Sequence, residues 1–235
     1  MPYSGQNHLL ASLPPADLKR WLPQLEAIEL PAGKVLCEPR GELSHAVFPT
    51  TAIVSLLYLT NNGASTEIAA IGNEGLIGIS LFMGGDFTPS RAVVRNAGHG
   101  LRMKAQALKD EFERMTVKRV LLRYTQALIT QAAQSAVCNR HHLLDQQLCR
   151  WLLLTLDRVP GDELEMTQEL IADTLGVRRE GVTDSAGKLQ KAGLIRYTRG
   201  RIKVLDRAGL ERRACECYTV VKMEYERLLP VTAAA

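Results

Sequence analysis

Apolar residues in the last third of the chain recur every three or four positions on either side of Gly176. Thr167 stands where the first of two helices would begin, and its hydroxyl can accept from a free backbone amide there. Gly176 falls at a sharp turn, because glycine enters left-handed backbone without a steric cost. The pattern predicts a helix-turn-helix whose inward-facing residues are Leu170, Ile171, Leu175, Val182, Ala186 and Leu189.

The second of these helices leaves a polar face outward, with an Arg and a Glu near its start. Such a helix can read base edges in the major groove of DNA, since Arg donates two bonds to guanine and Glu accepts from cytosine. An ordinary helical hairpin with a solvated charged face is the alternative. The outward positions are Arg178, Arg179, Glu180, Thr183, Asp184 and Lys188.

Residues 193–204 alternate between apolar and polar types around Gly200, which predicts a strand, a tight turn and a second strand. This hairpin would form the wing of a winged helix. Between residues 178 and 203 eight basic and two acidic side chains give a local charge of +6, whereas the whole chain carries +4. Such focused charge is typical of phosphate binding. The wing contributes Arg199, Arg201 and Lys203.

A long helix is predicted before this region, from a hydrophobic pattern with alternating steps of four and three residues. The pattern is a heptad seam of about three repeats and indicates pairing between two chains. The alternative is that the helix packs on its own domain. Polar residues near the end of the seam cost stability and call for a reason, such as a bound ligand. The seam consists of Val117, Leu121, Tyr124, Leu128, Gln131, Ser135 and Cys138.

The region from about Ser12 to Ala105 consists of short β-rich runs separated by glycines. The run Ile53–Leu59, the turn signal Asn61-Asn62-Gly63 and the run Thr66–Ile71 predict a hairpin. Strands at this spacing predict a β-sandwich or β-roll. The expected fold class is α+β, with an effector domain at 1–115, a dimerisation helix and hinge at 116–142, and a winged helix-turn-helix at 143–235.

Composition restricts the class of protein. The chain has 235 residues, of which 46% are hydrophobic and 23% charged, and no apolar run approaches the roughly 20 residues of a membrane span. The N-terminus lacks the pattern of a signal peptide. Five scattered cysteines fit a reducing compartment, so we expect a cytoplasmic protein. No Ser-His-Asp grouping, phosphate loop or metal motif has the required spacing, and we do not expect an enzyme.

The order of β-roll, long helix and winged helix resembles the cyclic-AMP receptor protein/FNR (Crp/Fnr) superfamily of bacterial transcription regulators. The resemblance covers roughly Leu9 to Val204 and is strongest in Leu148–Leu153, Thr167–Glu169 and Leu175–Glu180. It implies a homodimer that binds a two-fold symmetric site in double-stranded DNA and contacts RNA polymerase. It also implies an N-terminal signal that changes the angle of the DNA-binding domains.

The resemblance assigns roles within the helix-turn-helix. Arg179 and Glu180 match the Arg-Glu pair that reads bases in this family. Asp184 stands where an Arg is common, so the preferred DNA sequence is expected to differ. Contacts to phosphates, which position a protein without reading sequence, are expected from Arg178, Thr183, Lys188 and the three wing cations.

The resemblance is weaker at the family's cyclic-nucleotide pocket. Where the family has Gly-Glu-Leu the chain has Gly78-Ile79-Ser80-Leu81, and where it has Arg-Ser-Ala the chain has Ser90-Arg91-Ala92. The hydroxyl pair that meets the base falls on Ala132-Ala133. Cyclic AMP is therefore not expected, whereas another nucleotide effector and a purely structural β-roll both stay open. The candidate pocket residues are Gly78, Ser80, Ser90, Arg91, Arg95 and Gln131.

No metal site is predicted. Only Cys37 lies in the first half of the chain, so an iron–sulfur sensor of the FNR kind is not expected. His141-His142 and Cys215-Glu216-Cys217 are interpreted as hinge and packing residues. The sequence thus predicts a homodimeric, sequence-specific transcription regulator. The alternative is an effector-independent or non-specific DNA-binding protein with a structural β-roll.

Overall fold

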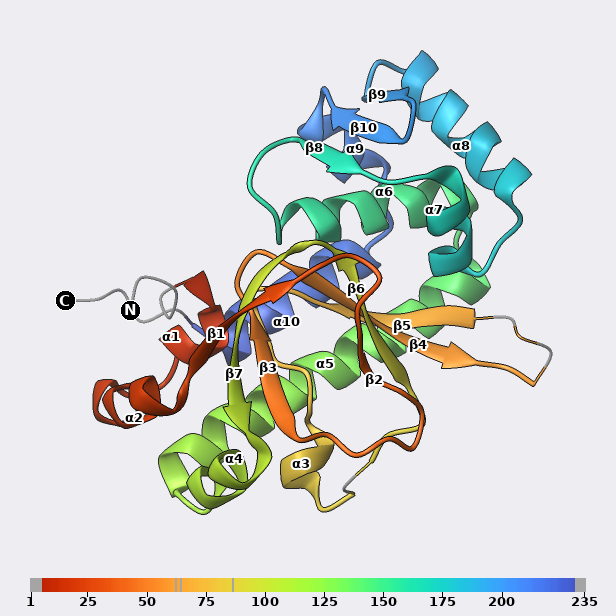
Figure 1. Cartoon of the computed structure of the whole chain (residues 1–235). Coiled ribbons are helices and arrows are strands. Elements are labelled where there is room, and N and C mark those ends of the chain that lie inside the picture. The colour runs from red at the N-terminus through yellow and green to blue at the C-terminus, as the bar shows by residue number, and fades with distance from the viewer. Residues whose placement is uncertain (1–5, 62, 64, 86, 231–235) are drawn as a thin grey trace. The chain divides into compact units, whose positions relative to one another are not determined.

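The computed structural model describes residues 6–61, 63, 65–85 and 87–230 (Figure 1). The chain divides into two compact units, each described by itself below. The first unit is Met1–Leu57, Ala69–Thr130 and Met223–Ala235, and the second is Tyr58–Ile68 and Gln131–Lys222. These limits differ from the contiguous ranges 1–115, 116–142 and 143–235, because the long helix and the last helix each contribute to both units. Residues 1–5 and 231–235 of those ranges, and Asn62 of the predicted turn, lie outside the described residues.

The first unit contains the β-rich part of the chain. Two antiparallel sheets with strand orders β1-β7-β3 and β2-β6-β4-β5 form the predicted β-roll. The second sheet includes the predicted hairpin strands. The elements are α1 (His8–Ala11), α2 (Pro15–Trp21), η2 (Leu22–Gln24), β1 (Glu26–Leu30), β2 (Val35–Cys37), β3 (His45–Pro49), β4 (Ile53–Leu59), β5 (Ser65–Ile71), α3 (Ser80–Met83), β6 (Arg91–Asn96), β7 (Gly98–Lys104) and α4 (Ala105–Phe112).

The core of the roll is closed by the N-terminal helices. Trp21 of α2 is almost fully buried and packs edge-on against Phe48 of β3, with ring centroids 6.0 Å apart. The indole Nε1 of Trp21 donates to Glu111 of α4 at 3.0 Å. Arg20 also donates to Glu111, through Nε at 3.0 Å and Nη2 at 2.8 Å. This buried carboxylate therefore links α2 to α4.

The long helix α5 (Met115–His141) is followed in the second unit by the predicted winged helix-turn-helix. Helix α6 packs against α8 and α9, and α8 packs against α7. The three-stranded sheet has the order β8-β10-β9. The elements are α6 (Leu144–Leu156), β8 (Glu163–Glu165), α7 (Gln168–Leu175), α8 (Arg179–Lys191), β9 (Ile195–Thr198), β10 (Arg201–Val204), α9 (Arg207–Arg213) and α10 (Cys217–Leu228).

The predicted dimer seam of α5 is buried within its own chain. The Tyr124 hydroxyl donates to the carbonyl of Leu76 at 2.7 Å, and a Cβ at Gly75 would overlap the Tyr124 ring. Near the end of the helix, Ser135 Oγ accepts from Arg150 Nη2 at 2.8 Å. This burial favours the alternative interpretation, in which the helix packs within its own chain. The residues so buried are Val117, Leu121, Tyr124, Leu128, Gln131, Ser135 and Cys138.

Another face of α5 carries exposed apolar side chains at a spacing of seven residues. Met115, Leu122 and Ile129 are 68%, 48% and 60% exposed. Residues seven apart lie on the same side of a helix.

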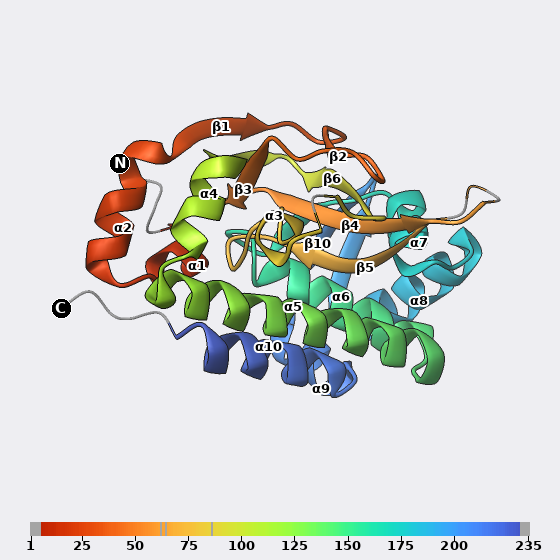
Figure 2. The ribbon, with the colours of Figure 1, turned by 90° about the horizontal axis from the view of Figure 1, so that it is seen from below.

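Figure 2 shows α10 beside α5, where Gln126 Nε2 donates to Glu224 Oε1 at 3.1 Å. No helix in the described part of the chain is long and apolar enough to cross a membrane.

Candidate nucleic-acid interface

The turn between α7 and α8 follows the geometry that its sequence predicts. Thr167 Oγ1 accepts from the Leu170 amide at 3.2 Å and so caps α7. Gly176 ends the helix with a φ of 66°. The amide of Val177 then donates back to the carbonyl of Ala172 at 3.0 Å, which satisfies a carbonyl of the last helical turn. These local contacts set where α8 begins.

Helix α8 has one buried and one exposed face. Leu189 and Val182 are fully buried in the core of the second unit, whereas Arg179, Glu180 and Asp184 are exposed. Arg178 precedes the first helical residue and is also exposed. The start of a helix favours negative charge, because its free amides and its dipole are positive there. The exposed face at this end therefore suits an anionic partner.

Thr183 is tied to the first helix of the motif. Its hydroxyl lies 2.8 Å from Gln168 Oε1 and 3.1 Å from the carbonyl of Arg179. Thr183, predicted as a phosphate contact, therefore already has protein partners. Its hydroxyl helps to fix α8 against α7. Gly181 approaches α6, since a Cβ there would lie 2.9 Å from Leu144 Cδ2.

The wing is a tight hairpin attached to α8. Arg199 and Gly200 connect β9 to β10 with φ values of 49° and 78°. A type I′ hairpin turn requires a positive φ at both of its central residues. Gln190 of α8 accepts from the Tyr197 amide at 2.7 Å, and the Tyr197 hydroxyl donates to the carbonyl of Met166 at 2.9 Å. Burial raises the pKa of Tyr197, so its phenol stays a donor at neutral pH.

A hollow of about 420 Å³ lies where the start of α7, the start of α8 and the tip of the wing meet. Two cationic side chains, Arg179 from the helix and Arg199 from the wing, stand on its wall. Backbone and hydroxyl groups provide further polar surface. The lining residues are Thr167, Gln168, Glu169, Arg179, Tyr197, Arg199 and Gly200.

The cations of α8, its preceding residue and the wing differ in their partners. Arg201 pairs with Glu165 at 2.9 Å, Lys203 with Asp162 at 3.7 Å and Lys188 with Asp145 at 3.8 Å. Within the described ranges, Arg178, Arg179 and Arg199 have no carboxylate oxygen within 4.0 Å. An incoming phosphate or base can therefore contact these three guanidinium groups without breaking an ion pair.

Three positioning residues were not predicted from the sequence. Tyr197 and Gln190 hold the wing on α8, and Gln168 holds Thr183. Tyr197 carried a weak signal, as an aromatic residue in a predicted strand next to basic residues. Nothing in the pattern distinguished Gln190 from an ordinary surface glutamine.

Four of the six candidate effector residues contact other protein side chains. Gly78 has a φ of 114° and precedes α3, at whose start Ser80 lies. Ser90 Oγ lies 2.8 Å from Thr88 Oγ1. The remaining three have protein partners: Arg91 pairs with Glu38 at 3.0 Å, Arg95 donates to Asn96 at 3.2 Å, and Gln131 of the second unit accepts from Arg158 at 3.0 Å.

The structure also brings together Cys138, His142, Cys215 and Cys217 inside the second unit. From the sequence alone, these residues are expected to be separate seam, hinge and packing positions. Their two pairs are more than 70 residues apart in the chain, so sequence spacing did not reveal the group.

Comparison with known families agrees with this geometry. Residues 146–213 match the family model of the Crp-like helix-turn-helix domain. A CRP/FNR-family transcriptional regulator from Thermus thermophilus is similar in structure, with 22% identity, coverage of 80% of this chain and 98% of the other, and a TM-score of 0.65. FixK2 from Bradyrhizobium japonicum is similar at 17% identity over 81% and 98% of the two chains, with a TM-score of 0.67.

A third similar structure is the c-di-GMP-responsive global regulator CLP from Xanthomonas campestris. It shares 15% identity over 81% of this chain and 99% of CLP, with a TM-score of 0.63. Comparison with curated protein sequences yields no significant match. The family match confirms a Crp-like helix-turn-helix domain at residues 146–213, and the solved structures confirm the predicted fold.

Proposed function

We propose that this chain, which carries a Crp-like helix-turn-helix domain on the fold of the Crp/Fnr regulators, is a homodimeric, sequence-specific DNA-binding regulator of transcription. The observation that carries the proposal is the pair of exposed guanidinium groups, Arg179 and Arg199, on the hollow between the reading helix and the wing. Among the residues described, neither side chain forms an ion pair. The first step of its action is binding to DNA rather than catalysis.

DNA is contacted in two ways, at the base edges and at the phosphates. Arg179 and Glu180 lie on the first turn of α8, where side chains reach base edges when a helix enters the major groove. Arg199 at the wing tip and Arg178 before the helix contact phosphates and position the domain. Asp184 is exposed one turn further along α8 and carries a negative charge. It selects for bases that offer a donor, such as the amino group of cytosine.

The second copy binds at the exposed stripe of α5. Met115, Leu122 and Ile129 form an apolar face on a helix of 27 residues. Exposed apolar side chains aligned along a helix are typical of a pairing surface. Val137 continues this face at 43% exposure. This stripe replaces the buried seam as the proposed dimer contact, and a two-fold dimer requires a two-fold symmetric DNA site.

The first unit is proposed not to take cyclic AMP through the contacts that the family uses. The chain lacks the family's carboxylate at Ser80, and Arg91 is paired with Glu38. CLP is c-di-GMP-responsive, and another nucleotide remains the effector class to test here. A thermal-shift screen of the full chain with cyclic mono- and dinucleotides tests this proposal. A rise in melting temperature with cyclic AMP that Arg91→Ala and Ser80→Ala both remove would contradict the proposal, whereas a rise that persists in both variants would mean that cyclic AMP binds through other contacts.

The experiment for DNA binding starts from a pool of random duplexes. Repeated selection with the purified protein should enrich one inverted repeat, and footprinting should show protection of both halves. Binding measured by fluorescence anisotropy should fall steeply with salt, because phosphate contacts release counterions. Equal affinity for the enriched and scrambled duplexes would leave the non-specific DNA-binding alternative instead. Contact with RNA polymerase is tested by transcription in vitro from a promoter that carries the enriched site.

A further inference from the structure

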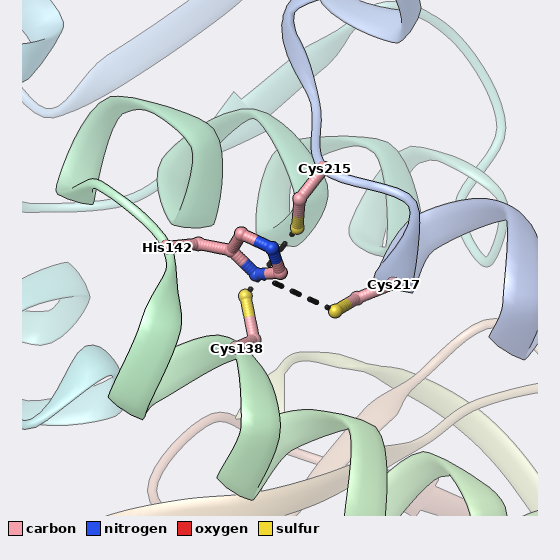
Figure 3. A group of neighbouring side chains, drawn as sticks. All are labelled: Cys138, His142, Cys215 and Cys217. Atoms are coloured by element: carbon pink, nitrogen blue, oxygen red, sulfur yellow. Dashed lines mark hydrogen bonds between the residues drawn. The ribbon is translucent and has the colours of Figure 1, made fainter.

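Three cysteine thiols and one imidazole converge inside the second unit. Cys138 lies near the end of α5 and His142 directly follows it, whereas Cys215 lies just before α10 and Cys217 is the first residue of α10 (Figure 3). Their ligand atoms all lie within 4.8 Å of one another. The three cysteines are buried, and the His142 side chain is 14% exposed.

We propose that Cys138, His142, Cys215 and Cys217 form a structural zinc site. Three thiolates and one imidazole are a common ligand set for structural Zn²⁺. Four protein ligands complete a tetrahedron, which leaves no open position for a substrate. The proposal concerns the described residues of the second unit and stands independently of DNA binding.

The separations between ligand atoms fit a tetrahedral ion. Cys138 Sγ lies 3.5 Å from Cys215 Sγ, and Cys217 Sγ lies 3.6 Å from His142 Nδ1. With Zn–S bonds of about 2.3 Å and Zn–N bonds of about 2.0 Å, the edges of a tetrahedron measure about 3.5–3.8 Å. The sulfur–nitrogen edge therefore already has about the length that the ion requires, the sulfur–sulfur edge is slightly shorter than the roughly 3.8 Å expected for it, and all four ligand atoms lie within 4.8 Å of one another.

The backbone prepares the first ligand pair. Cys138 and His142 are four residues apart, and the His142 amide donates to the carbonyl of Cys138 at 3.1 Å. Residues at this spacing share one helix face. Gln147 Nε2 donates to the carbonyls of His142 at 2.9 Å and Cys138 at 3.3 Å. The helix end is therefore held in the conformation that directs both side chains to one point.

The second nitrogen of His142 has the partner that metal-bound histidines usually have. Its Nδ1 faces the sulfur of Cys217, while its Nε2 lies 3.3 Å from Glu216 Oε1. A carboxylate that accepts from the outer ring nitrogen fixes the tautomer and leaves the inner nitrogen free to bind a metal. Glu216 stands between the two ligand cysteines in the chain, so one short segment supplies two ligands and this outer partner.

The charge of the site is balanced by Arg150. Three thiolates and one Zn²⁺ carry a net charge of −1, which is costly to bury without a cation. Arg150 is 6% exposed, interacts electrostatically with Cys138 and Cys217, and donates to the hydroxyl of Ser135. Its Nε is buried with no partner among the described residues. A buried guanidinium in these surroundings suits an anionic metal–thiolate group.

The bound ion would join the end of α5 to the segment before α10, which are 77 residues apart at Cys138 and Cys215. An ion that binds only the folded arrangement stabilises that arrangement. The expected effect is a higher melting temperature of the zinc-loaded full chain than of the same protein after removal of zinc with a chelator.

The test measures metal in the purified full-length chain. Elemental analysis should find one zinc ion per chain. Replacement of zinc by Co²⁺ should give the ligand-field absorption of a tetrahedral ion together with thiolate-to-cobalt charge transfer. Cys215→Ser and His142→Gln should reduce retained zinc by at least about tenfold, since each removes a ligand. Cys149→Ser and His141→Gln are the matched controls, because Cys149 is another buried cysteine of the second unit and His141 is the exposed neighbour of His142.

Glu216→Gln separates a metal site from a packing cluster. It should keep the zinc stoichiometry and weaken zinc affinity by about 10–100-fold, as loss of an outer partner does. Circular dichroism of each variant shows whether the fold is retained, and zinc titration of Glu216→Gln keeps the test valid if a cysteine variant does not fold. Zinc content that is unchanged in folded ligand variants would overturn the proposal. A Cys138–Cys215 disulfide in a freshly purified, metal-free protein that does not bind zinc after reduction would also overturn it.

Discussion

At the scale of single residues, the presence or absence of an ion-pair partner distinguishes the basic side chains of the wing. Arg199 and Arg201 lie on opposite sides of Gly200, yet only Arg201 is paired, with Glu165. An exposed ion pair contributes little to stability, but a paired guanidinium must give up its carboxylate before it binds a phosphate. Net charge alone therefore overstates how many of these cations contribute to DNA binding.

Replacing Arg199 with Ala should weaken binding to all duplexes alike and reduce the slope of log K against log salt by about 1. Arg201→Ala, the matched control from the same hairpin, should have a smaller effect on both quantities. The measurement is a salt titration of affinity by fluorescence anisotropy, with the enriched and a scrambled duplex. If Arg201→Ala changed the slope as much as Arg199→Ala, ion pairing would not determine which cations contact phosphates.

Arg179→Ala should act differently from either wing variant. Its loss should cost about 1–3 kcal/mol on the enriched site and relax the preference at one base pair in each half-site, while affinity for scrambled DNA changes little. Competition with duplexes that differ at single positions measures this preference. A uniform loss over all sequences would instead place Arg179 on a phosphate and leave the reading of bases to other side chains of α8.

Glu111 provides a prediction about pH. Hydrogen bonds from Arg20 hold the pKa of this carboxyl below its ordinary value of 4.5, against the opposing effect of burial. The folded state therefore favours the carboxylate. The resulting stability is present above the unfolded pKa and is lost as the pH falls through the lower folded pKa.

In the Glu111→Gln variant the free energy of unfolding should fall less steeply with acid below about pH 4.5 than in the unaltered chain. Near neutral pH the variant should lose about 1–3 kcal/mol, because Arg20 and Trp21 lose a charged acceptor. Urea unfolding at a series of pH values measures both effects. Glu113→Gln, which changes an exposed residue two positions away, should leave the profile unchanged; equal profiles for both variants would mean that Glu111 does not titrate in this range.

Among the helices and strands, the sequence predicted those whose ends are determined by residues in the adjoining turn. Thr167, Gly176 and Gly200 each act on the turn in which they stand, and the structure has α7, α8 and the wing where these residues predict them. The face of α5 that packs against the core is determined by contacts with distant parts of the chain. Two sets of apolar residues on this helix share a period of seven, and periodicity alone does not show which set faces the chain's own core.

The same reason explains what was missed in the second unit. Cys138 and Cys215 meet only because α5 and the segment before α10 are brought together by the fold. Cys138 and His142 form one pair in the sequence and Cys215 and Cys217 form the other. Neither pair alone matches the spacing of a metal-binding motif. The positioning role of Gln190 likewise depends on the strand that packs against α8.

The exposed stripe of α5 yields a prediction about assembly. Ile129→Arg should convert the dimer to a monomer, because a charge at the centre of an apolar contact loses its water without gaining a partner. Sedimentation velocity measures the change. Met83→Arg is the matched control, since Met83 is a similarly exposed apolar residue on α3. Dimers that persist in Ile129→Arg would place the contact elsewhere.

At the scale of the whole molecule, dimerisation and DNA reading must be coupled if the protein binds a two-fold symmetric site. Two reading helices in one dimer fit half-sites about one helical turn apart, roughly 34–36 Å from centre to centre. Inserting about five base pairs between the halves turns one half-site to the opposite side of the duplex, since a full turn takes about 10 base pairs. The dimer should then bind with the affinity of a single half-site.

The Ile129→Arg monomer makes this prediction specific. It should bind the original and the lengthened site with the same weak affinity, because it never engages both halves together. The unaltered protein should discriminate strongly between the two sites, and Met83→Arg should behave like it. Affinities measured at one salt concentration for three proteins and two duplexes decide the matter. If the unaltered dimer tolerated the insertion as well as the monomer does, its two winged helices would be joined too loosely to read symmetry, and recognition would belong to each chain alone.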